Sequence, residues 1–213
     1  MLHIIITLFC ILFPFTCSFA EKLYVVERER EGLSVIEDFK HTKMINGLGN
    51  MNHATVNVHG GFAYVISRDG FLSKIDIQTD SLLKKVKVGK SGIGFTFVRE
   101  FIAVANYDPQ DVVILDNELN VVKKIDTGSR NVGIKANDRF LVFSLMDKDE
   151  IWVLDAEKGF EVHKVFTKVG AMPFDALLAD EVYIAGFFAE SSVGMLNLKS
   201  MEYAKKDFRK GDG

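Results

Sequence analysis

The stretch 54–88, ATVNVHGGFAYVISRDGFLSKIDIQTDSLLKKVKV, decides the fold. Its apolar runs are rich in Val, Ile, Leu and Phe, and polar or glycine-containing triplets separate them, as antiparallel hairpins require. We expect strands near residues 54–58, 62–67, 72–77 and 82–88. The triplets His59-Gly60-Gly61, Arg68-Asp69-Gly70 and Gln78-Thr79-Asp80 form the turns. This stretch therefore predicts one four-stranded antiparallel sheet, with strands a to d in chain order.

The same pattern occurs five times along the chain. The copies begin at Leu23, Phe62, Ile102, Leu141 and Val182, and four of them read FAYVISRDGFLSKID, IAVANYDPQDVVILD, LVFSLMDKDEIWVLD and VYIAGFFAESSVGMLN. Their closing residues, Asp76, Asp116, Asp155 and Asn197, are 40, 39 and 42 residues apart. A period of this length with short strands is typical of propeller blades, so we predict an all-β fold, a β-propeller of four-stranded antiparallel blades.

The number of repeats predicts an incomplete ring. The 193 residues after residue 20 supply fewer than five blades at about forty residues each. The first copy lacks strand a, and the last ends near a basic tail that contains Lys205, Lys206, Arg209 and Lys210. An open arc exposes two unpaired sheet edges. We therefore expect the domain at 21–213 to be part of a larger, eight-bladed ring, with a small closed propeller as the alternative.

Residues 1–20 are interpreted as a signal peptide for export. The apolar run 4–13 is too short to span a bilayer, and small residues follow it up to Ala20, which predicts cleavage before Glu21. The segment has no Lys or Arg, so a retained anchor helix is the alternative. No later stretch is long and apolar enough to span a bilayer.

Composition and cysteine usage exclude several classes of function. Lys+Arg 26 against Asp+Glu 29 gives a net charge of −3, which argues against a nucleic-acid binder. Both cysteines, Cys10 and Cys17, lie in the predicted signal peptide, so the mature chain has no disulfide, Cys-ligated metal or Cys nucleophile. Lipidation of Cys17 after a different cleavage is an alternative. No G-x-S-x-G, Walker A or G-x-G-x-x-G motif is present, nor any histidine pair with zinc-site spacing.

The blade geometry places two sets of loops at one end of the ring. Strands a and b are antiparallel, so the b–c turns and the loops that lead into strand a share that end. The b–c turns carry Arg68, Asp108 and Asp147, and the loops into strand a carry His53, Lys90, Arg130 and Asp175. Cations, carboxylates and an imidazole suit a polyanionic ligand with a metal centre. For each of these residues, a solvated loop position is the alternative interpretation.

His53, in NMNHATV, precedes an inner strand, where packing of the backbone can fix the ring. Such a residue suits axial ligation of a heme-type iron, although a capping or core histidine is equally consistent. Trp152 falls in a strand c and is expected in the core.

Six segments carry a family resemblance: LYVVERE, NHAT, FAYVISRDGFLSKID, ANYDPQDVVILD, FSLMDKDEIWVLD and FDALLADEVYIAG. They resemble the NirF family of heme d1 biosynthesis proteins, which is itself similar to the eight-bladed d1 domain of cytochrome cd1 nitrite reductase. The resemblance runs from Leu23 to about Asn197. It implies a periplasmic protein needed to make heme d1, the modified tetrapyrrole of the nitrite reductase of denitrifiers, and a full length of about twice this chain.

The resemblance also implies roles for individual residues. His53 corresponds to the axial iron ligand of the d1 pocket, and Arg68 to an arginine that forms a salt bridge with a macrocycle carboxylate. Lys90 and Arg130 would neutralise further carboxylates. Asp147 corresponds to an acidic residue that serves as acid or base.

Two classes of function follow. The first is a maturation protein that binds heme d1 or its dihydro precursor, and either modifies a side chain in an oxidoreductase or lyase step or transfers the precursor to nitrite reductase. Its partners would be the tetrapyrrole precursor, other heme d1 maturation proteins and nitrite reductase. The second is a non-enzymatic propeller scaffold for protein partners. No C-x-x-C-H motif is present, which excludes self-sufficient nitrite reduction.

Overall fold

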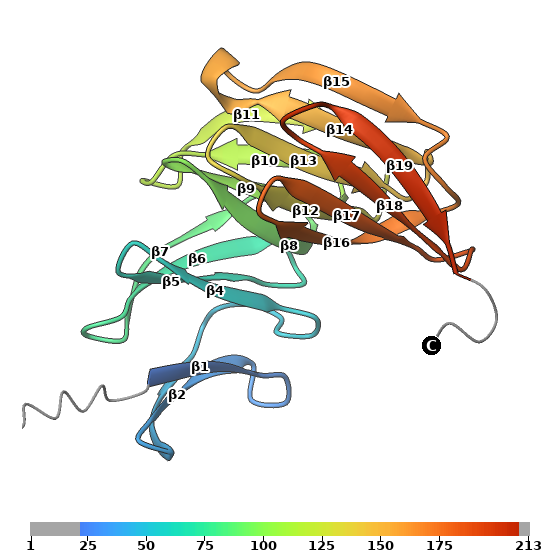
Figure 1. Ribbon diagram of the computed structural model, residues 1–213. Helices are drawn as coiled ribbons and strands as arrows, with labels where there is room; N and C mark the ends of the chain where they lie inside the picture. The colour runs from blue at the N-terminus through green and yellow to red at the C-terminus, as the bar shows by residue number, and fades with distance from the viewer. Residues whose placement is uncertain (1–21, 209–213) are drawn as a thin grey trace, which may run out of the picture.

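The computed structural model describes residues 22–208, without the side chain of Asp175. These residues form five antiparallel sheets that follow one another in an open arc, from the first sheet (blue) to the last (red) (Figure 1). The predicted signal peptide at 1–20 lies outside the described residues. Within residues 22–208, no helix has the length and apolar character needed to cross a membrane.

Strand order follows the chain in every sheet. The first sheet has three strands: β1 Lys22–Glu27, β2 Gly32–Glu37 and β3 Lys40–Ile45. The second has β4 Thr55–His59, β5 Phe62–Ile66, β6 Phe71–Asp76 and β7 Ser81–Lys87. The third has β8 Ser91–Val98, β9 Phe101–Asp108, β10 Asp111–Leu115 and β11 Val121–Asp126. The fourth has β12 Val132–Ala136, β13 Phe140–Leu145, β14 Glu150–Asp155 and β15 Glu161–Thr167, with the 3₁₀ turn Ala156–Lys158 between the last two strands. The fifth has β16 Pro173–Ala179, β17 Val182–Phe187, β18 Ser192–Asn197 and β19 Glu202–Asp207.

The predicted fold class is confirmed: the sheets are blades of an incomplete propeller. The four strands expected in stretch 54–88 begin and end within one residue of β4 to β7. Within the described residues the first sheet has no counterpart of strand a, as its repeat predicts. Trp152 lies in β14 and packs against buried apolar side chains.

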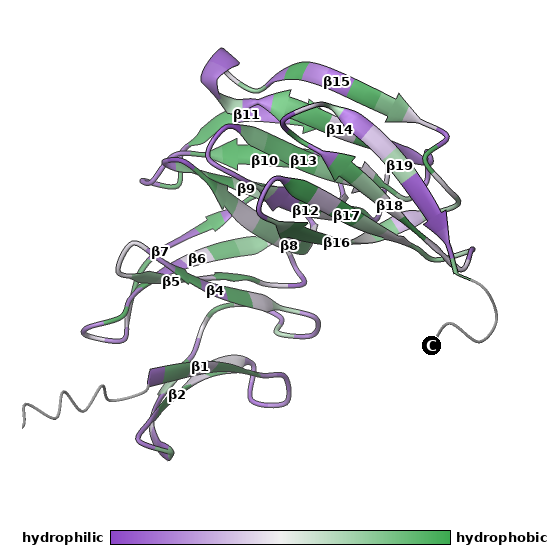
Figure 2. Ribbon diagram, viewed as in Figure 1, coloured by the Kyte–Doolittle hydropathy of each residue, from purple (hydrophilic) through white to green (hydrophobic). Residues whose placement is uncertain are grey.

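Four apolar clusters fill the four spaces between the five sheets. Successive side chains of a strand point to opposite faces of its sheet, so the residues of one strand belong to two clusters. In β13, for example, Leu141 and Phe143 pack toward the third sheet, and Phe140 and Val142 pack toward the fifth. Figure 2 shows the consequence, with hydrophobic colour along the middle strands and hydrophilic colour at many of the turns.

The two sheets at the ends of the arc have no such neighbour on their second face. Leu23 in β1 is 42% exposed and Leu177 in β16 is 58% exposed. Both belong to strands whose alternate residues are more deeply buried in the adjoining cluster.

In the second to fifth repeats, the closing residue forms the c–d turn. Oδ1 of Asp76 accepts hydrogen bonds from the backbone N–H groups of Gln78 and Thr79, both at 2.8 Å. Asp116, Asp155 and Asn197 accept equivalent bonds from the backbone of their own turns. This is an Asx turn, in which a short side chain replaces a backbone acceptor. The repeat period in the sequence is therefore the spacing of these turns.

Inner strands β4, β8, β12 and β16 form the hub, and β8, β12 and β16 lie next to one another. Gly133 of β12 allows the closest approach there, since a Cβ atom on this residue would lie 2.1 Å from the carbonyl oxygen of Phe174 in β16. Gly94 of β8 also lies in the hub, but a Cβ atom there would meet nothing within 4 Å.

We predict that Gly133→Ala lowers the free energy of unfolding by about 1–3 kcal/mol, because the added methyl group forces β12 and β16 apart. Gly94→Ala is the matched control and should leave the stability unchanged or raise it by up to about 1 kcal/mol. Urea unfolding followed by circular dichroism measures both variants. Equal effects of the two substitutions would contradict the hub packing described here.

The c–d turns also predict a loss of stability in acid. Backbone N–H donors, chiefly those of Thr79 and Asn120, lower the pKa values of Asp76 and Asp116 below their usual range. A carboxyl with a lowered pKa in the folded state contributes stability above its unfolded pKa of about 3.9, and that contribution is lost as pH falls through the folded pKa. We expect Asp76→Asn with Asp116→Asn to flatten the pH dependence of unfolding below about pH 4, because Asn keeps the acceptor, as Asn197 does. Chemical denaturation from pH 2 to 6 tests this, and an unchanged slope in the double variant would contradict it.

Candidate functional site

The b–c turns and the loops into the inner strands meet at one end of the arc, as the repeat geometry predicts. Lys90 donates its backbone N–H to the carbonyl oxygen of Asp108 at 2.6 Å, and its Nζ lies 3.7 Å from Oδ2 of Asp108. Both side chains are exposed, so the ion pair itself adds little stability. The contact nevertheless joins the loop into β8 to the next b–c turn. We call this end of the arc the mouth; it consists of the turns and loops at 46–54, 67–70, 88–90, 108–110, 127–131 and 146–149.

Tyr107, near the end of β9 in the third sheet, contacts two arginines of the mouth: Arg68 in the turn of the second sheet and Arg130 in the loop that enters the fourth. Its ring centroid is 5.3 Å from Cζ of Arg68 and 5.9 Å from Cζ of Arg130, within the range of cation–π attraction. Among the residues that the structure describes, no carboxylate comes within ion-pair distance of either guanidinium. A hollow of about 420 Å³ opens beside them, lined by Tyr107, Asp108, Gln110 and Arg130. The mouth thus holds two arginines without carboxylate partners among the described residues, and one of them, Arg130, lines a space that a ligand can enter.

Asp147 holds the backbone of the loop that contains Arg130 in place. Its Oδ2 accepts the backbone N–H of Arg130 at 2.6 Å and the hydroxyl of Ser129 at 3.3 Å. The hydroxyl oxygen of Ser129 in turn accepts the backbone N–H of Asp147 at 3.1 Å. The predicted acid or base is therefore also an anchor between a b–c turn and the loop into β12.

Asp69 fixes the loop that leads to His53 in the same way. Its Oδ1 accepts the backbone N–H of Asn50 at 2.8 Å and the hydroxyl of Ser67 at 2.7 Å. Burial would raise the pKa of this carboxyl, but these hydrogen bonds and the charge of Lys87 outweigh burial and lower it. Arg68 donates its backbone N–H to the carbonyl oxygen of Asn50 at 2.8 Å. The His53 loop therefore lies directly against the turn that carries Arg68.

His53 is exposed, at the end of a tight turn just before β4. Ala54 donates its N–H to the carbonyl oxygen of Met51 at 3.2 Å, and His53 adopts a φ of 61° between them. Met51 is fully buried and holds the turn to the core. Within the part of the chain that the structure describes, the imidazole forms no hydrogen bond, and no group of three or more His, Cys, Asp or Glu residues is placed to hold a metal ion.

A buried polar pair lies beneath the Lys90 loop. Nδ2 of Asn106, which is fully buried, donates to Oδ1 of Asp111 at 2.8 Å and to the carbonyl oxygen of Val88 at 3.1 Å. Burial raises the pKa of Asp111. A Cβ atom at Gly89 would lie 2.5 Å from Oδ1 of Asn106, so only glycine lets the loop pass over this pair.

The remaining mouth prediction needs a correction. Asp175 was expected in the loop before an inner strand, but it lies inside β16, between the paired residues Pro173 and Ala176 where the register shifts. The irregular pairing there extends the strand toward its N-terminal end, so the strand begins earlier than the apolar pattern suggests.

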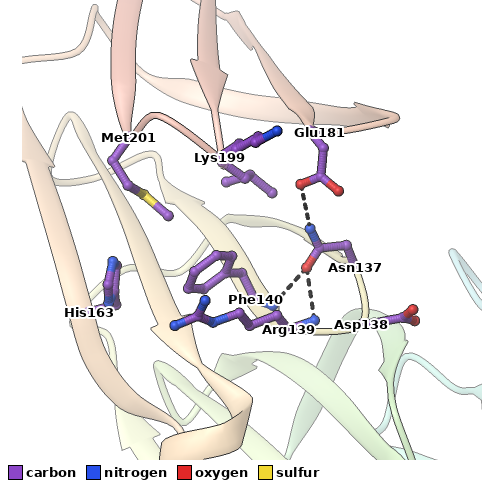
Figure 3. A pocket seen from close by; sticks show the side chains of 9 residues that line it. Asn137, Asp138, Arg139, Phe140, His163, Glu181, Lys199 and Met201 are labelled. Carbon is purple, nitrogen blue, oxygen red and sulfur yellow. Dashed lines mark hydrogen bonds between the residues drawn. The ribbon is translucent and has the colours of Figure 1, made fainter.

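A hollow larger than the one at the mouth lies at the opposite end of the arc. It measures about 800 Å³ and opens between the fourth and fifth sheets (Figure 3). Three of its polar side chains already have structural partners: Asn137 donates to Glu181 at 3.1 Å, and Arg139 pairs with the buried carboxylate of Asp155 at 3.1 Å. Figure 3 also shows Asn137 accepting the backbone N–H groups of Arg139 and Phe140. Size alone therefore does not identify the functional end.

Sequence reasoning missed Tyr107 and Asp69. Tyr107 immediately precedes Asp108, a predicted mouth residue, and the corresponding positions of the second and fourth copies are Ser67 and Met146. An aromatic residue near the end of strand b distinguishes this copy from the second and fourth, but the fifth copy has Phe187 at the same position, so the sequence signal is not specific.

The sequence of this chain is similar to that of a known family and of two curated proteins. The model of the cytochrome D1 heme domain family matches residues 20–211. Protein NirF of Stutzerimonas stutzeri is 37% identical and protein NirF of Pseudomonas aeruginosa 32% identical, each over 193 residues. Each match covers 82% of this chain and 49% of the relative, so the chain spans about half the length of the curated relatives it matches.

A solved structure shares the fold. The dihydro-heme d1 dehydrogenase NirN, in complex with DHE, superposes with a TM-score of 0.72 at 20% identity, over 88% of this chain and 44% of NirN. The repeat, the arc of blades and the family match agree. This chain belongs to the cytochrome D1 heme domain family.

Proposed function

We propose that this chain is part of a periplasmic protein of heme d1 biosynthesis whose mouth binds heme d1 or its dihydro precursor. The observation that carries the proposal is the pair of guanidiniums, Arg68 and Arg130, which lie over the same Tyr107 ring without a carboxylate partner among the described residues, beside a hollow that Tyr107 and Arg130 line. The NirF relatives and the NirN complex support a ligand of this class.

The donor set of the mouth fits an iron tetrapyrrole. Arg68 and Arg130 match the acidic side chains of such a macrocycle, because a guanidinium binds a carboxylate through two parallel hydrogen bonds. Lys90 is exposed in the same mouth, and its ammonium, which lies 3.7 Å from the Asp108 carboxylate, can turn to a ligand carboxylate instead. His53 presents an imidazole that is free of hydrogen bonds to described residues, so a ring nitrogen is available as an axial ligand. The bound iron would supply the colour and redox chemistry of the complex.

Asp147 is the residue we assign to proton transfer. Its hydrogen bonds to the Arg130 N–H and the Ser129 hydroxyl both use Oδ2, which leaves Oδ1 available to a ligand. A carboxylate held in this way acts as acid or base for modification of a side chain, in an oxidoreductase or lyase step. The modified tetrapyrrole would then pass to nitrite reductase, directly or through other heme d1 maturation proteins.

We expect His53→Ala to remove the spectral signature of axial ligation. Full-length protein is mixed with dihydro-heme d1, and the visible spectrum is compared for wild type, His53→Ala and His41→Ala. His41 lies exposed on the outer strand β3, so the His41 variant should match wild type. If wild type shows only the spectrum of free pigment, the proposed function is wrong. If wild type shifts the spectrum and His53→Ala shifts it equally, the ligand assignment alone is wrong.

We expect Asp147→Asn and Asp147→Ala to differ. Asparagine keeps an oxygen acceptor for the Arg130 N–H but cannot transfer a proton, so binding should stay within about two-fold while conversion falls by about 10²–10⁴-fold. Alanine should reduce binding as well, because the Arg130 loop loses its anchor. Titration and product analysis of the full-length protein separate the two effects, with Asp138→Asn, an exposed carboxylate at the opposite end of the arc, as control. Normal conversion by Asp147→Asn would remove Asp147 from the chemistry.

A further inference from the structure

We propose that Tyr107 is a positioning residue that holds Arg68 and Arg130 as one matched pair, so that the mouth selects a ligand with two carboxylates. The inference rests on the proposed function for the identity of the ligand. The placement of the two arginines by Tyr107, however, is a property of the protein itself.

The backbones of both arginines are fixed by groups other than Tyr107. Asn50 accepts the N–H of Arg68, and Asp147 accepts the N–H of Arg130. These bonds set where each side chain begins but leave its long, flexible stem free. Without a further contact, two guanidiniums near one another would separate by like-charge repulsion and sample many rotamers.

The Tyr107 ring supplies that further contact for both arginines. Its centroid lies 5.3 Å from Arg68 Cζ and 5.9 Å from Arg130 Cζ, and the face of the ring attracts each positive charge. Tyr107 is half-buried at the end of β9, so its own position is set by the blade. One ring therefore connects a turn of the second blade with the loop that enters the fourth.

The ring acts here rather than the hydroxyl. In residues 22–208 the Tyr107 hydroxyl forms no hydrogen bond to a described residue, whereas the hydroxyls of Tyr183 and Tyr203 do. Phenylalanine should therefore replace Tyr107 in this task, and leucine, of similar bulk but without an aromatic face, should not.

This arrangement has a consequence for ligand choice. Two guanidiniums held at a fixed spacing lose little conformational entropy when they bind, provided that the ligand presents two carboxylates at the matching distance. A ligand with one carboxylate satisfies one arginine and leaves the second unpaired. We expect the preference for two carboxylates to depend on Tyr107.

The first test uses the ligand-free full-length protein. Ring currents should displace the Nε–H signals of Arg68 and Arg130 in nuclear magnetic resonance spectra, with assignments from Arg68→Lys and Arg130→Lys. We expect wild type and Tyr107→Phe to show the displacement and Tyr107→Leu to lose it for both arginines. Signals that stay in place in Tyr107→Leu, with the remaining spectrum unchanged, would overturn the proposal. The Nε–H signal of Arg99, assigned with Arg99→Lys, serves as the control and should not move in Tyr107→Leu. Arg99 pairs with Glu157 at the opposite end of the arc.

The second test measures affinity for dihydro-heme d1 and for the same macrocycle with esterified carboxylates. Tyr107→Leu should weaken binding of the free acid about ten-fold and leave the ester unchanged, while Tyr107→Phe stays within about two-fold of wild type. Equal losses for acid and ester would mean a merely structural role and overturn the proposal. If wild type binds neither macrocycle, the proposed function fails, and the ligand-free spectra still decide whether Tyr107 places the arginines.

Discussion

Burial of both faces of each sheet is the constraint on which the molecule depends. The strands of a middle blade place alternate apolar side chains into two different clusters, so neither face tolerates water. A blade of this composition is stable only between two neighbours, and consecutive blades related by a short loop must stack. Stacking in turn brings every second loop to the same end of the arc. The packing of the core therefore brings the loops of the mouth together, and the hydrogen bonds between mouth residues act on loops that are already close.

The mouth contains two kinds of residue: those that fix the backbone of its loops and those whose side chains are available to a ligand. Asp69 and Asp147 use their carboxylates on backbone N–H groups and tie each b–c turn to the loop beside it. Gly89 lets its loop pass closely over Asn106. These residues fix the backbone, whereas Arg68, Arg130 and His53 project without a fixed polar partner among the described residues. Rigid backbone beneath free polar side chains is the arrangement that a binding site needs.

Local chemistry explains what the sequence predicted well. Turn triplets and closing Asp residues act over two or three residues, so the strands of stretch 54–88 and the repeat period were predictable. The shared end of the loops followed from antiparallel order alone. Contacts that cross blades were not predictable: Tyr107 meets side chains 39 positions before it and 23 after it, and nothing in those segments encodes the rotamers. Asp175 was misplaced because a register shift in β16 has no composition signal. The selection of His53 among the histidines came from resemblance, since an exposed imidazole has no pattern of its own.

The two ends of the arc differ in how their arginines are paired, and this difference identifies the functional end better than volume does. At the end with the larger hollow, Arg139 pairs with Asp155 and Arg99 with Glu157, so these two arginines already have carboxylate partners in the fold. At the mouth, Arg68 and Arg130 face an aromatic ring instead, which attracts a cation without cancelling its charge. A guanidinium held on a ring keeps all of its N–H donors for an incoming anion, whereas one paired with a carboxylate has part of its donors and its charge engaged. The smaller hollow is therefore the one prepared for an anionic ligand.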